Sequence, residues 1–303
     1  MTTQDMITVP YPQTVRPLSK VNIWYLPDGS KRVRAYLQME CLKQGAQTGV
    51  AIEGSNLMKR AFGFKGRVGP LFASQSGSNL VSLTAKTMCS YLARKIDADR
   101  STAVIYWATG PAGASIEVVG DLNAFQVELH DFVGPKVFGS GVQLLPAIRY
   151  FVEQFADADW GMYVFLTQGR IDDLEAVKRY TRELAGAIAA GRRNELKLAL
   201  IGVGEDIDRS PLQQLDDLNT DTGVDVWDYR IAAEMRSLVE IFAEVVDENT
   251  PVARSGRILN AAGEVIVDYA EQGVPALLNF TLPPQSRSFS VELDGNLITQ
   301  PIF

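Results

Sequence analysis

The chain has 303 residues, of which 46% are hydrophobic and 21% charged, and its formal net charge is −7. This composition is typical of a soluble globular protein with one large domain or two smaller ones. The acidic balance argues against nucleic acid or an anionic membrane as the main partner, because both would repel the chain. We therefore expect protein partners, with no nucleic-acid and no membrane binding.

The sequence contains few of the residues that metal sites and hydrolase active sites need. The two cysteines, Cys41 and Cys89, lie in apolar surroundings and are expected to be buried free thiols, with a disulfide or a metal pair as the alternative. A zinc site or a catalytic triad would have to rest on the one histidine, His130, so most hydrolase mechanisms are excluded. The first residues lack the pattern of a secretory signal, and no apolar run approaches ~20 residues, so we expect a cytoplasmic protein.

The chain begins with β-type patterns. Residues 1–17 are polar and punctuated by proline, which predicts a flexible arm. Two β-rich runs then span residues 21–42 and flank a Pro-Asp-Gly-Ser turn at 27–30, which predicts an antiparallel hairpin. An isolated hairpin is marginally stable in water, so this one needs further strands as partners.

From residue 48 to 247, apolar strands alternate with amphipathic helices, which predicts an α/β domain. Two of the strands are almost wholly apolar, so helices should cover both of their faces in a doubly wound, mostly parallel sheet of six strands. The predicted strands are Gly49–Glu53, Thr102–Ala108, Ser115–Val119, Met162–Thr167, Leu196–Val203 and Val224–Trp227. The predicted helices are Asn79–Ile96, Ala124–Asp131, Leu144–Phe155, Asp172–Ala190, Pro211–Leu218 and Tyr229–Val246. Ser210 is expected to cap the fifth helix, with Pro211 following it.

After residue 248 the pattern returns to period-2 runs separated by turn sequences, which predicts roughly four short strands. These strands are the available partners of the N-terminal hairpin. We expect residues 18–47 and 248–303 to form one small, discontinuous β unit, into which the α/β domain of residues 48–247 is inserted.

Three segments, in this order and at this spacing, resemble a von Willebrand factor type A (vWA) domain. The first strand ends in Ile-Glu-Gly-Ser-Asn-Leu-Met at residues 52–58, where the family usually has Asp-x-Ser-x-Ser followed by Met. Residues 139–155 resemble the family's Gly-Gly-Thr loop and the Pro-Ala-containing helix after it. Residues 163–173 resemble the strand that normally ends in Thr-Asp-Gly. The resemblance spans residues 48–247.

This resemblance implies a metal-ion-dependent adhesion site, in which oxygen ligands hold a divalent cation, usually magnesium, and a partner protein supplies the last ligand. The corresponding positions here are Glu53, Ser55, Leu57, Val142 and Gln168. Leu57 and Val142 have no donor oxygen, whereas magnesium requires near-octahedral oxygen coordination at about 2.0–2.1 Å. We therefore expect a degenerate site with no metal cofactor, in which Glu53, Ser55 and Gln168 bond to each other and to the loop backbone. Asp172 and Asp173, close to Gln168, are expected to interact with the N-terminus of their own helix, with the donation of a metal ligand as the alternative.

The resemblance also implies a bacterial intracellular type of vWA domain, whose members act in multi-protein stress or tellurite-resistance-type systems, often with ATPases. We expect a non-enzymatic protein-interaction module, such as a subunit or adaptor, whose partner surface lies on the strand-edge loops. The candidate protein-binding residues are Glu53, Ser55, Asn56, Lys59, Arg60, Lys65, Arg67, Gln168 and Arg170. The rim of this partner surface would be the segment Lys59–Gly77, in which four cations accompany Phe62, Phe64 and Phe72. The alternative for this segment is a solvated loop whose aromatic side chains pack inward.

Two alternatives stay open. The first is an enzyme that uses Glu53 as a general acid or base, which predicts a deep pocket with a buried, unpaired carboxyl. The second is a structural subunit that self-associates through the edges of the β unit or through the N-terminal arm.

Overall fold

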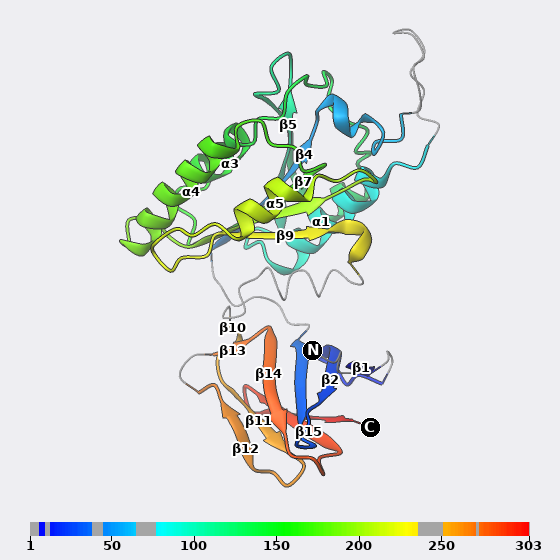
Figure 1. Ribbon diagram of the computed structural model, residues 1–303, viewed down its shortest axis with the longest axis vertical. Helices are drawn as coiled ribbons and strands as arrows, with labels where there is room; N and C mark the ends of the chain where they lie inside the picture. The colour runs from blue at the N-terminus through cyan, green and yellow to red at the C-terminus, as the bar shows by residue number, and fades with distance from the viewer. Residues whose placement is uncertain are drawn as a thin grey trace. The chain divides into compact units, whose positions relative to one another are not determined.

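The computed structural model describes residues 6–9, 13–37, 45–64, 77–235, 251–270 and 273–302. The chain divides into two compact units, one formed by Met1–Lys43 with Ser237–Phe303 and the other by Gln44–Arg236 (Figure 1). Within the described ranges, no helix has both the length and the apolar character needed to cross a bilayer.

The larger unit is built on a six-stranded sheet with the order β6-β5-β4-β7-β8-β9. Neighbouring strands pair in parallel, except that β6 is antiparallel to β5. The predicted α/β fold with a six-stranded, mostly parallel sheet is therefore confirmed, and it is consistent with a vWA-like or Rossmann-like arrangement. The strands are β4 (Ala46–Glu53), β5 (Ser101–Thr109), β6 (Ser115–Asn123), β7 (Trp160–Thr167), β8 (Leu196–Gly202) and β9 (Trp227–Ile231).

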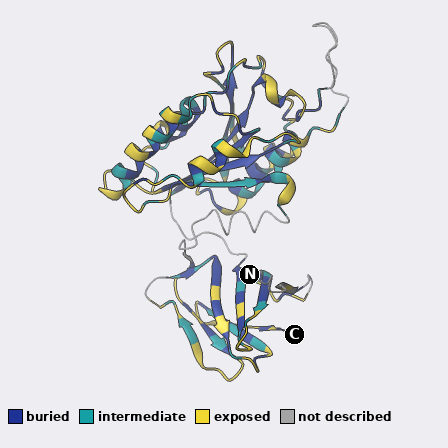
Figure 2. Ribbon diagram, viewed as in Figure 1, coloured by how far each residue is buried: buried dark blue, intermediate teal, exposed yellow. Residues whose placement is uncertain are grey.

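Helices cover both faces of this sheet. On one face, α3, α4 and α5 contribute to a continuous hydrophobic cluster with the strands, and on the other face α1 packs against β4, β5 and α2 (Figure 1). The central strands are buried along their whole length, while the helices keep an exposed side (Figure 2). The helices are α1 (Leu80–Lys95), α2 (Ala124–Leu129), α3 (Leu145–Gln154), α4 (Leu174–Ala189) and α5 (Arg209–Asp216), with short 3-10 turns η1 (Asn56–Lys59) and η2 (Ala232–Glu234).

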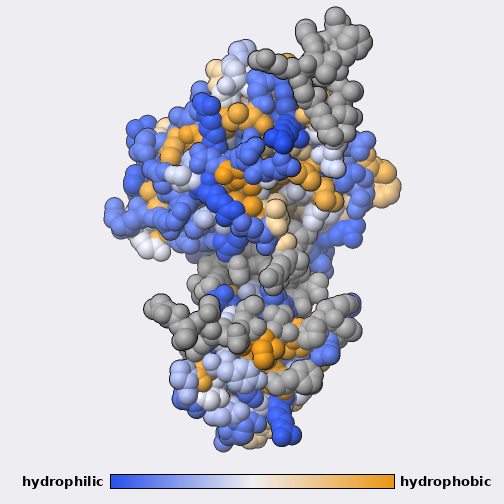
Figure 3. All heavy atoms as spheres, turned by 45° about the vertical axis from the view of Figure 1, so that its right-hand side comes forward, coloured by the Kyte–Doolittle hydropathy of each residue, from blue (hydrophilic) through white to orange (hydrophobic). Residues whose placement is uncertain are grey.

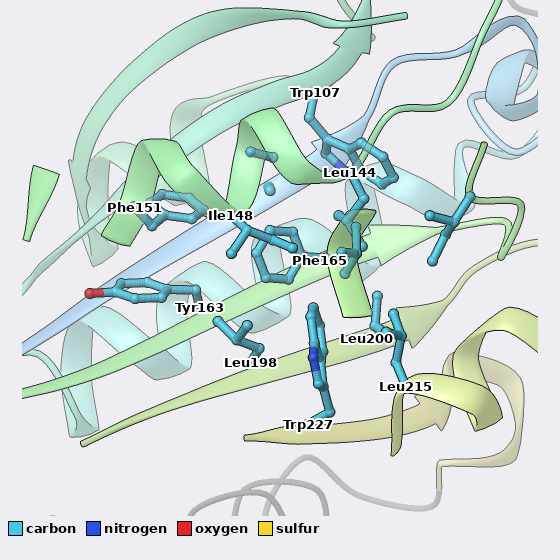
Figure 4. Packing of buried hydrophobic residues seen from close by; sticks show 14 of the residues in the cluster. Trp107, Leu144, Ile148, Phe151, Tyr163, Phe165, Leu198, Leu200, Leu215 and Trp227 are labelled. Carbon is cyan, nitrogen blue, oxygen red and sulfur yellow. The ribbon is translucent and has the colours of Figure 1, made fainter. Parts of the chain in front are cut away.

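Aromatic side chains fill the cluster beneath α3 and α4 (Figure 4). The rings of Phe151 and Tyr163 stack with their centroids 5.0 Å apart, and Trp227 lies 6.0 Å from Phe165. A Cβ at Gly49 would collide with the ring of Phe151, so the glycine lets this ring lie directly against β4. On the opposite face, Cys89 is a buried free thiol, as predicted. Cys41 lies outside the described residues.

The sixth strand differs from the prediction. A strand over 224–227 and a helix from 229 were expected, but β9 runs from Trp227 to Ile231. The side chains of Trp227, Tyr229 and Ile231 all pack into the aromatic cluster, and this alternation is that of a strand with one buried face. The helix prediction is therefore wrong at residues 229–231, and its part from 236 to 246 lies outside the described residues.

The start of α5 also differs. Asp208, rather than Ser210, is the N-cap residue, and its carboxylate accepts from the backbone N–H of Ser210 at 3.2 Å. The predicted cap at Ser210 is therefore wrong: the helix begins two residues earlier, at a residue type that caps helices as well as serine does.

The smaller unit contains strands from both ends of the chain. Strand β3 pairs in antiparallel with β2 on one side and with β14 on the other, in a sheet of order β1-β2-β3-β14. A second sheet has the order β12-β11-β15-β16, and β10 pairs with β13. The strands are β1 (Met6–Val9), β2 (Leu18–Tyr25), β3 (Lys31–Leu37), β10 (Pro251–Ala253), β11 (Gly256–Asn260), β12 (Val265–Asp268), β13 (Val274–Pro275), β14 (Leu277–Leu282), β15 (Ser288–Leu293) and β16 (Asn296–Pro301).

The N-terminal arm is a partial exception to the prediction. Residues 6–9, expected to be flexible, form β1 because their backbone pairs with Val21–Trp24 of β2.

The face of the molecule shown in Figure 3 is largely hydrophilic, with apolar patches separated by polar residues.

Candidate functional site

The carboxyl ends of β4 and β7 lie next to each other in the larger sheet. From this pair the strand order runs outward to β5 and β6 on one side and to β8 and β9 on the other. Open parallel sheets commonly bind ligands at such a point, because the loops diverge there and leave a crevice. β4 ends at Glu53 and β7 at Thr167, so these residues and the loops after them form the candidate site.

Glu53 is fully buried and bonded to three donors. One carboxylate oxygen accepts from the hydroxyl of Ser55. The other accepts from the hydroxyl of Thr167 at 2.7 Å and from the backbone N–H of Gln168 at 2.9 Å. Glu53 and Thr167 have 0% of their surface exposed and Ser55 has 1%. The carboxylate therefore ties the loop after β4 to the loop after β7.

Burial dominates the electrostatics of this group. It raises the pKa of Glu53 above the usual value, because the charged form loses its hydration. The bonds from Ser55, Thr167 and Gln168 act in the opposite direction and offset part of the rise, while the charge of Asp172 adds slightly to it. Glu53 therefore holds a proton more readily than an exposed glutamate does, and solvent does not reach it.

A neighbouring loop fixes the segment after Glu53. The backbone N–H of Asn56 donates to the carbonyl of Gly139 at 2.8 Å, and the N–H of Gly139 donates to the carbonyl of Gly54 at 2.9 Å. The N–H of Gly54 donates to the carbonyl of Trp107 at 2.7 Å. A Cβ at Gly54 would lie 2.7 Å from Cγ of Pro135, which explains why this position requires glycine.

The positions that correspond to metal ligands do not form a magnesium site. Val142 lies in the hydrophobic cluster with 1% exposure, and Leu57 is 41% exposed. Gln168 contributes its backbone N–H, a donor, to Glu53. Glu53 is the only charged residue among the five corresponding positions, and a magnesium ion would have to displace the three donors that bond to it. The ion would also meet the aliphatic side chains of Leu57 and Val142, so the residues present do not fit magnesium. Among the described residues, no three His, Cys, Asp or Glu side chains are grouped so as to hold a metal.

Asp172 and Asp173 have a different role from the one predicted. Asp173 is the N-cap of α4, but it makes no side-chain bond to that helix. Its carboxylate accepts from the backbone N–H groups of Leu144 and Leu145 at 2.8 and 3.0 Å, and Asp172 accepts from Val142 at 2.8 Å. The two aspartates therefore satisfy backbone N–H groups at the start of α3, the neighbouring helix.

The rim of the site is partly neutralised. Arg60 pairs with Glu205 at 2.8 Å and with Asp206 at 3.6 Å, and the ammonium of Lys59 lies 5.1 Å from the centre of the Phe138 ring. Phe62 is buried. Phe64 also packs against Phe138, with ring centroids 5.7 Å apart. The described part of the rim is thus an aromatic cluster with paired cations; Lys65, Arg67 and Phe72 lie outside the described residues.

A pocket of about 420 Å³ opens beside this rim. It brings together the loops after β4, β7 and β8 and the start of α1. Its described lining residues are Arg60, Ala61, Gly63, Phe64, Gly77, Ser78, Leu80, Gln168, Gly204, Glu205 and Asp206. Glu53 does not line it.

The predicted binding residues therefore fall into two groups. Asn56, Lys59, Arg60 and Arg170 are exposed and Gln168 is partly exposed, so a partner can reach them. Glu53 and Ser55 are buried, and including them as direct contacts was wrong. Sequence reasoning also missed Thr167, whose position at the end of an apolar strand next to Gln168 was the available signal.

No family model and no curated protein matches the sequence. Among solved structures, the open form of the pilus adhesin SpaC from Lactobacillus rhamnosus GG is similar over 100% of this chain at 12% identity and a TM-score of 0.45; the chain spans 48% of its length. The PilB minor pilin from Streptococcus sanguinis is similar over 80% of this chain and 76% of its own, at 14% identity and a TM-score of 0.42. The VWA domain of SpRpn10 is similar over 68% of this chain and 95% of its own, at 10% identity and a TM-score of 0.41. At these values, nothing about partners or assembly follows from the likenesses.

Proposed function

We propose that the strand-edge surface of the larger unit binds another protein, and that the chain is a non-enzymatic interaction module. The observation that supports this most directly is that the buried carboxylate of Glu53 bonds to the loops after β4 and β7 and not to a ligand site. The carboxylate of Glu53, at the end of β4, holds two loops together and has no exposed surface through which a ligand could reach it. The loops that it holds present exposed side chains in fixed positions, as a protein-binding surface requires.

The arrangement speaks against an enzyme that acts through Glu53. Such an enzyme needs a carboxyl that is open to a pocket and not already satisfied. Glu53 has no exposed surface, and both of its oxygens accept hydrogen bonds from the protein. Its raised pKa follows from burial and does not indicate a catalytic role.

The exposed loop residues suit contact with a protein. Leu57 is 41% exposed although it follows a buried strand, and Lys59, two residues further along the chain, is also exposed. Arg170 bonds to Asp172 at 2.7 Å through its Nε, which leaves its terminal nitrogens for a partner. Exposed leucine and arginine side chains on loops held in fixed positions are features of protein interfaces.

The finer expectations from the sequence form part of this proposal. We propose that the chain serves as a subunit or adaptor in a bacterial multi-protein system of the stress or tellurite-resistance type, in the cytoplasm, with a degenerate metal site. The support for these points is the resemblance of three sequence segments to vWA domains.

Affinity purification from the source organism, with quantitative mass spectrometry, tests the proposal. The edge variant is Leu57→Asp with Arg170→Glu, and the matched control is Leu129→Asp with Arg179→Glu, which changes the same residue types at exposed helical positions. We expect the edge variant to lose at least one protein that the wild type and the control recover to the same extent. Recovery of identical proteins by all three would overturn the proposal.

A further variant separates binding from catalysis. Glu53→Gln keeps the shape and most of the hydrogen bonds of the buried network. The interaction proposal predicts unchanged recovery of partners for this variant, whereas an activity that depends on Glu53 would be lost.

A further inference from the structure

A second surface, independent of the strand-edge site, lies on the smaller unit. In the sheet β1-β2-β3-β14, alternate residues of each strand point into the hydrophobic core of the unit, among them Ile23, Val33 and Phe280. The intervening residues form the opposite face, which we call the cationic face. Its exposed or half-buried members on β2, β3 and β14 are Lys20, Trp24, Arg32, Arg34, Asn279 and Thr281. Asn22 lies between Lys20 and Trp24 on this side of the sheet but is buried, and the face ends at Tyr36 and Leu277, which belong to the core of the unit.

The charge of this face is one-sided. It carries Lys20, Arg32 and Arg34, and no aspartate or glutamate occurs among the members just named. The whole chain, in contrast, has 36 acidic residues against 29 basic ones. Among the described residues Arg32 forms no ion pair, and Arg34 bonds to the neutral amide of Asn279, so the positive charge of this face is not neutralised there. A patch of one sign on a chain of the other sign attracts ligands of the opposite charge.

The face is also hollowed. A pocket of about 350 Å³ lies on it, lined by Trp24, Arg32, Arg34 and Asn279 among the described residues. In the ladder, Arg32 lies directly between Trp24 and Thr281, and Arg34 lies between Asn22 and Asn279. The Nε of Arg34 donates to Oδ1 of Asn279 at 3.2 Å, which orients the guanidinium and leaves its two terminal nitrogens.

We propose that the cationic face binds an extended acidic segment of a protein partner, with alternate carboxylates of the segment on Arg32 and Arg34. Guanidinium groups bind carboxylates through two parallel hydrogen bonds, and both Arg32 and Arg34 have their terminal nitrogens available for such a pair, with Arg34 oriented by Asn279. The half-buried indole of Trp24 supplies apolar surface for the side chain of an intervening residue, and the Asn279 amide can bond to a peptide backbone.

The spacing of the two arginines supports an extended segment. Arg32 and Arg34 are two residues apart on one strand, so they are separated by about 7 Å along the sheet. Alternate side chains of an extended peptide repeat at the same distance, so glutamates at every second position match both arginines at once.

Single-stranded nucleic acid is the main rival, because arginines and an aromatic ring also bind phosphates and bases. A nucleic acid repels the rest of this acidic chain, however, and tight binding normally uses a longer track of cations than the face provides. The observations therefore favour the acidic peptide, and nucleic acid becomes an outcome of the test.

Intrinsic fluorescence provides the assay. Of the four tryptophans in the chain, Trp107, Trp160 and Trp227 are at most 2% exposed, so a change in emission on binding reports Trp24. The full-length chain is titrated with a short peptide of alternating glutamate and serine, with its glutamine counterpart, and with a thymidine oligonucleotide. We expect a saturable change with the glutamate peptide alone, weakened by added salt.

Charge reversal locates the binding. Arg32→Glu with Arg34→Glu should weaken binding by at least about tenfold, because two charge-assisted pairs become repulsive. Arg254→Glu, an exposed position in the same unit, is the matched control and should bind as the wild type does. If circular dichroism shows that the double variant is misfolded, Arg32→Gln with Arg34→Gln replaces it, with the same expected direction. Equal binding of both peptides, tighter binding of the oligonucleotide, no binding at millimolar peptide, or full affinity in the double variant would each overturn the proposal.

Discussion

Replacing Glu53 tests the structural role assigned to the centre of the strand-edge site. Glu53→Ala removes the acceptor of three donors and leaves a small cavity. The hydroxyls of Ser55 and Thr167 can rotate toward other acceptors, but the backbone N–H of Gln168 cannot. An orphaned buried donor costs about 1–3 kcal/mol, and the cavity adds to this, so we expect a loss of about 2–4 kcal/mol in the free energy of unfolding.

Glu53→Gln should behave differently. Its amide oxygen can accept from Thr167 and Gln168, and its NH₂ group can donate to the oxygen of Ser55. It also removes a buried charge, so the free energy of unfolding at pH 7 should lie within about 1 kcal/mol of the wild-type value or above it.

The pH dependence separates charge from shape. Burial raises the pKa of Glu53 in the folded state, so the native protein binds this proton more tightly than the unfolded chain does. The contribution of Glu53 to stability is therefore greatest below the unfolded pKa of about 4.5 and decreases as the pH rises through the folded pKa. Urea unfolding of wild type and Glu53→Gln between pH 4 and 8 should show the variant gaining relative stability with rising pH. A constant difference, or an equal loss in the Gln and Ala variants, would refute the account of a buried, hydrogen-bonded carboxylate.

Three further predictions concern other parts of the larger unit. Gly54→Ala should destabilise the protein by about 1–3 kcal/mol, since its Cβ would lie 2.7 Å from Pro135 and 2.9 Å from Thr109. Gly186→Ala in α4, where a Cβ meets nothing within 4 Å, should stabilise it by about 0.5–1 kcal/mol. A higher melting temperature for Gly54→Ala than for Gly186→Ala would contradict both predictions. Burial raises the pKa of Asp228 from 3.8 to about 7, against the opposing effect of Lys197 at 3.7 Å. The contribution of Asp228 to stability is therefore lost as the pH rises from about 4 through about 7. Asp228→Asn should remove this pH dependence in urea unfolding, and an unchanged pH profile in the variant would contradict the prediction. Millimolar magnesium should leave the melting temperature unchanged, and an increase that Glu53→Ala abolishes would show that the site holds the ion after all.

The sequence predicted the centre of the larger sheet well, for a physical reason. β7 and β8 are apolar at nearly every position, and only a strand covered on both faces accommodates such a run. The edge strand β9 was harder to assign because only its two end residues, Trp227 and Ile231, are fully buried. Trp227 and Ile231 are also four residues apart, which is the spacing of one helix face, so the short segment fitted two periodicities.

The site itself was predicted in part. Glu53 and Ser55 could be placed at the end of β4 from the vWA-like pattern, and their mutual hydrogen bond was expected. The acceptor role of Asp172 and Asp173 toward the start of α3 was not foreseeable, because it depends on how the N-termini of two consecutive helices are placed beside each other in space. The same holds for the pairing of Arg60 with Glu205 and Asp206, which joins the loops after β4 and β8.

The pairing of β3 with β14 has a consequence for how the chain is made. The N-terminal strands leave the ribosome first, but the strand that completes their sheet is synthesised only after the entire inserted α/β unit. Throughout this interval β3 has an open edge with unpaired backbone groups, which is the kind of surface that mispairs or recruits chaperones. The inserted unit, in contrast, has all its strands within one continuous segment and can fold at once. Biogenesis should therefore proceed from the inside outward, and a chain that stalls before β14 would carry a folded insert within an unfinished host.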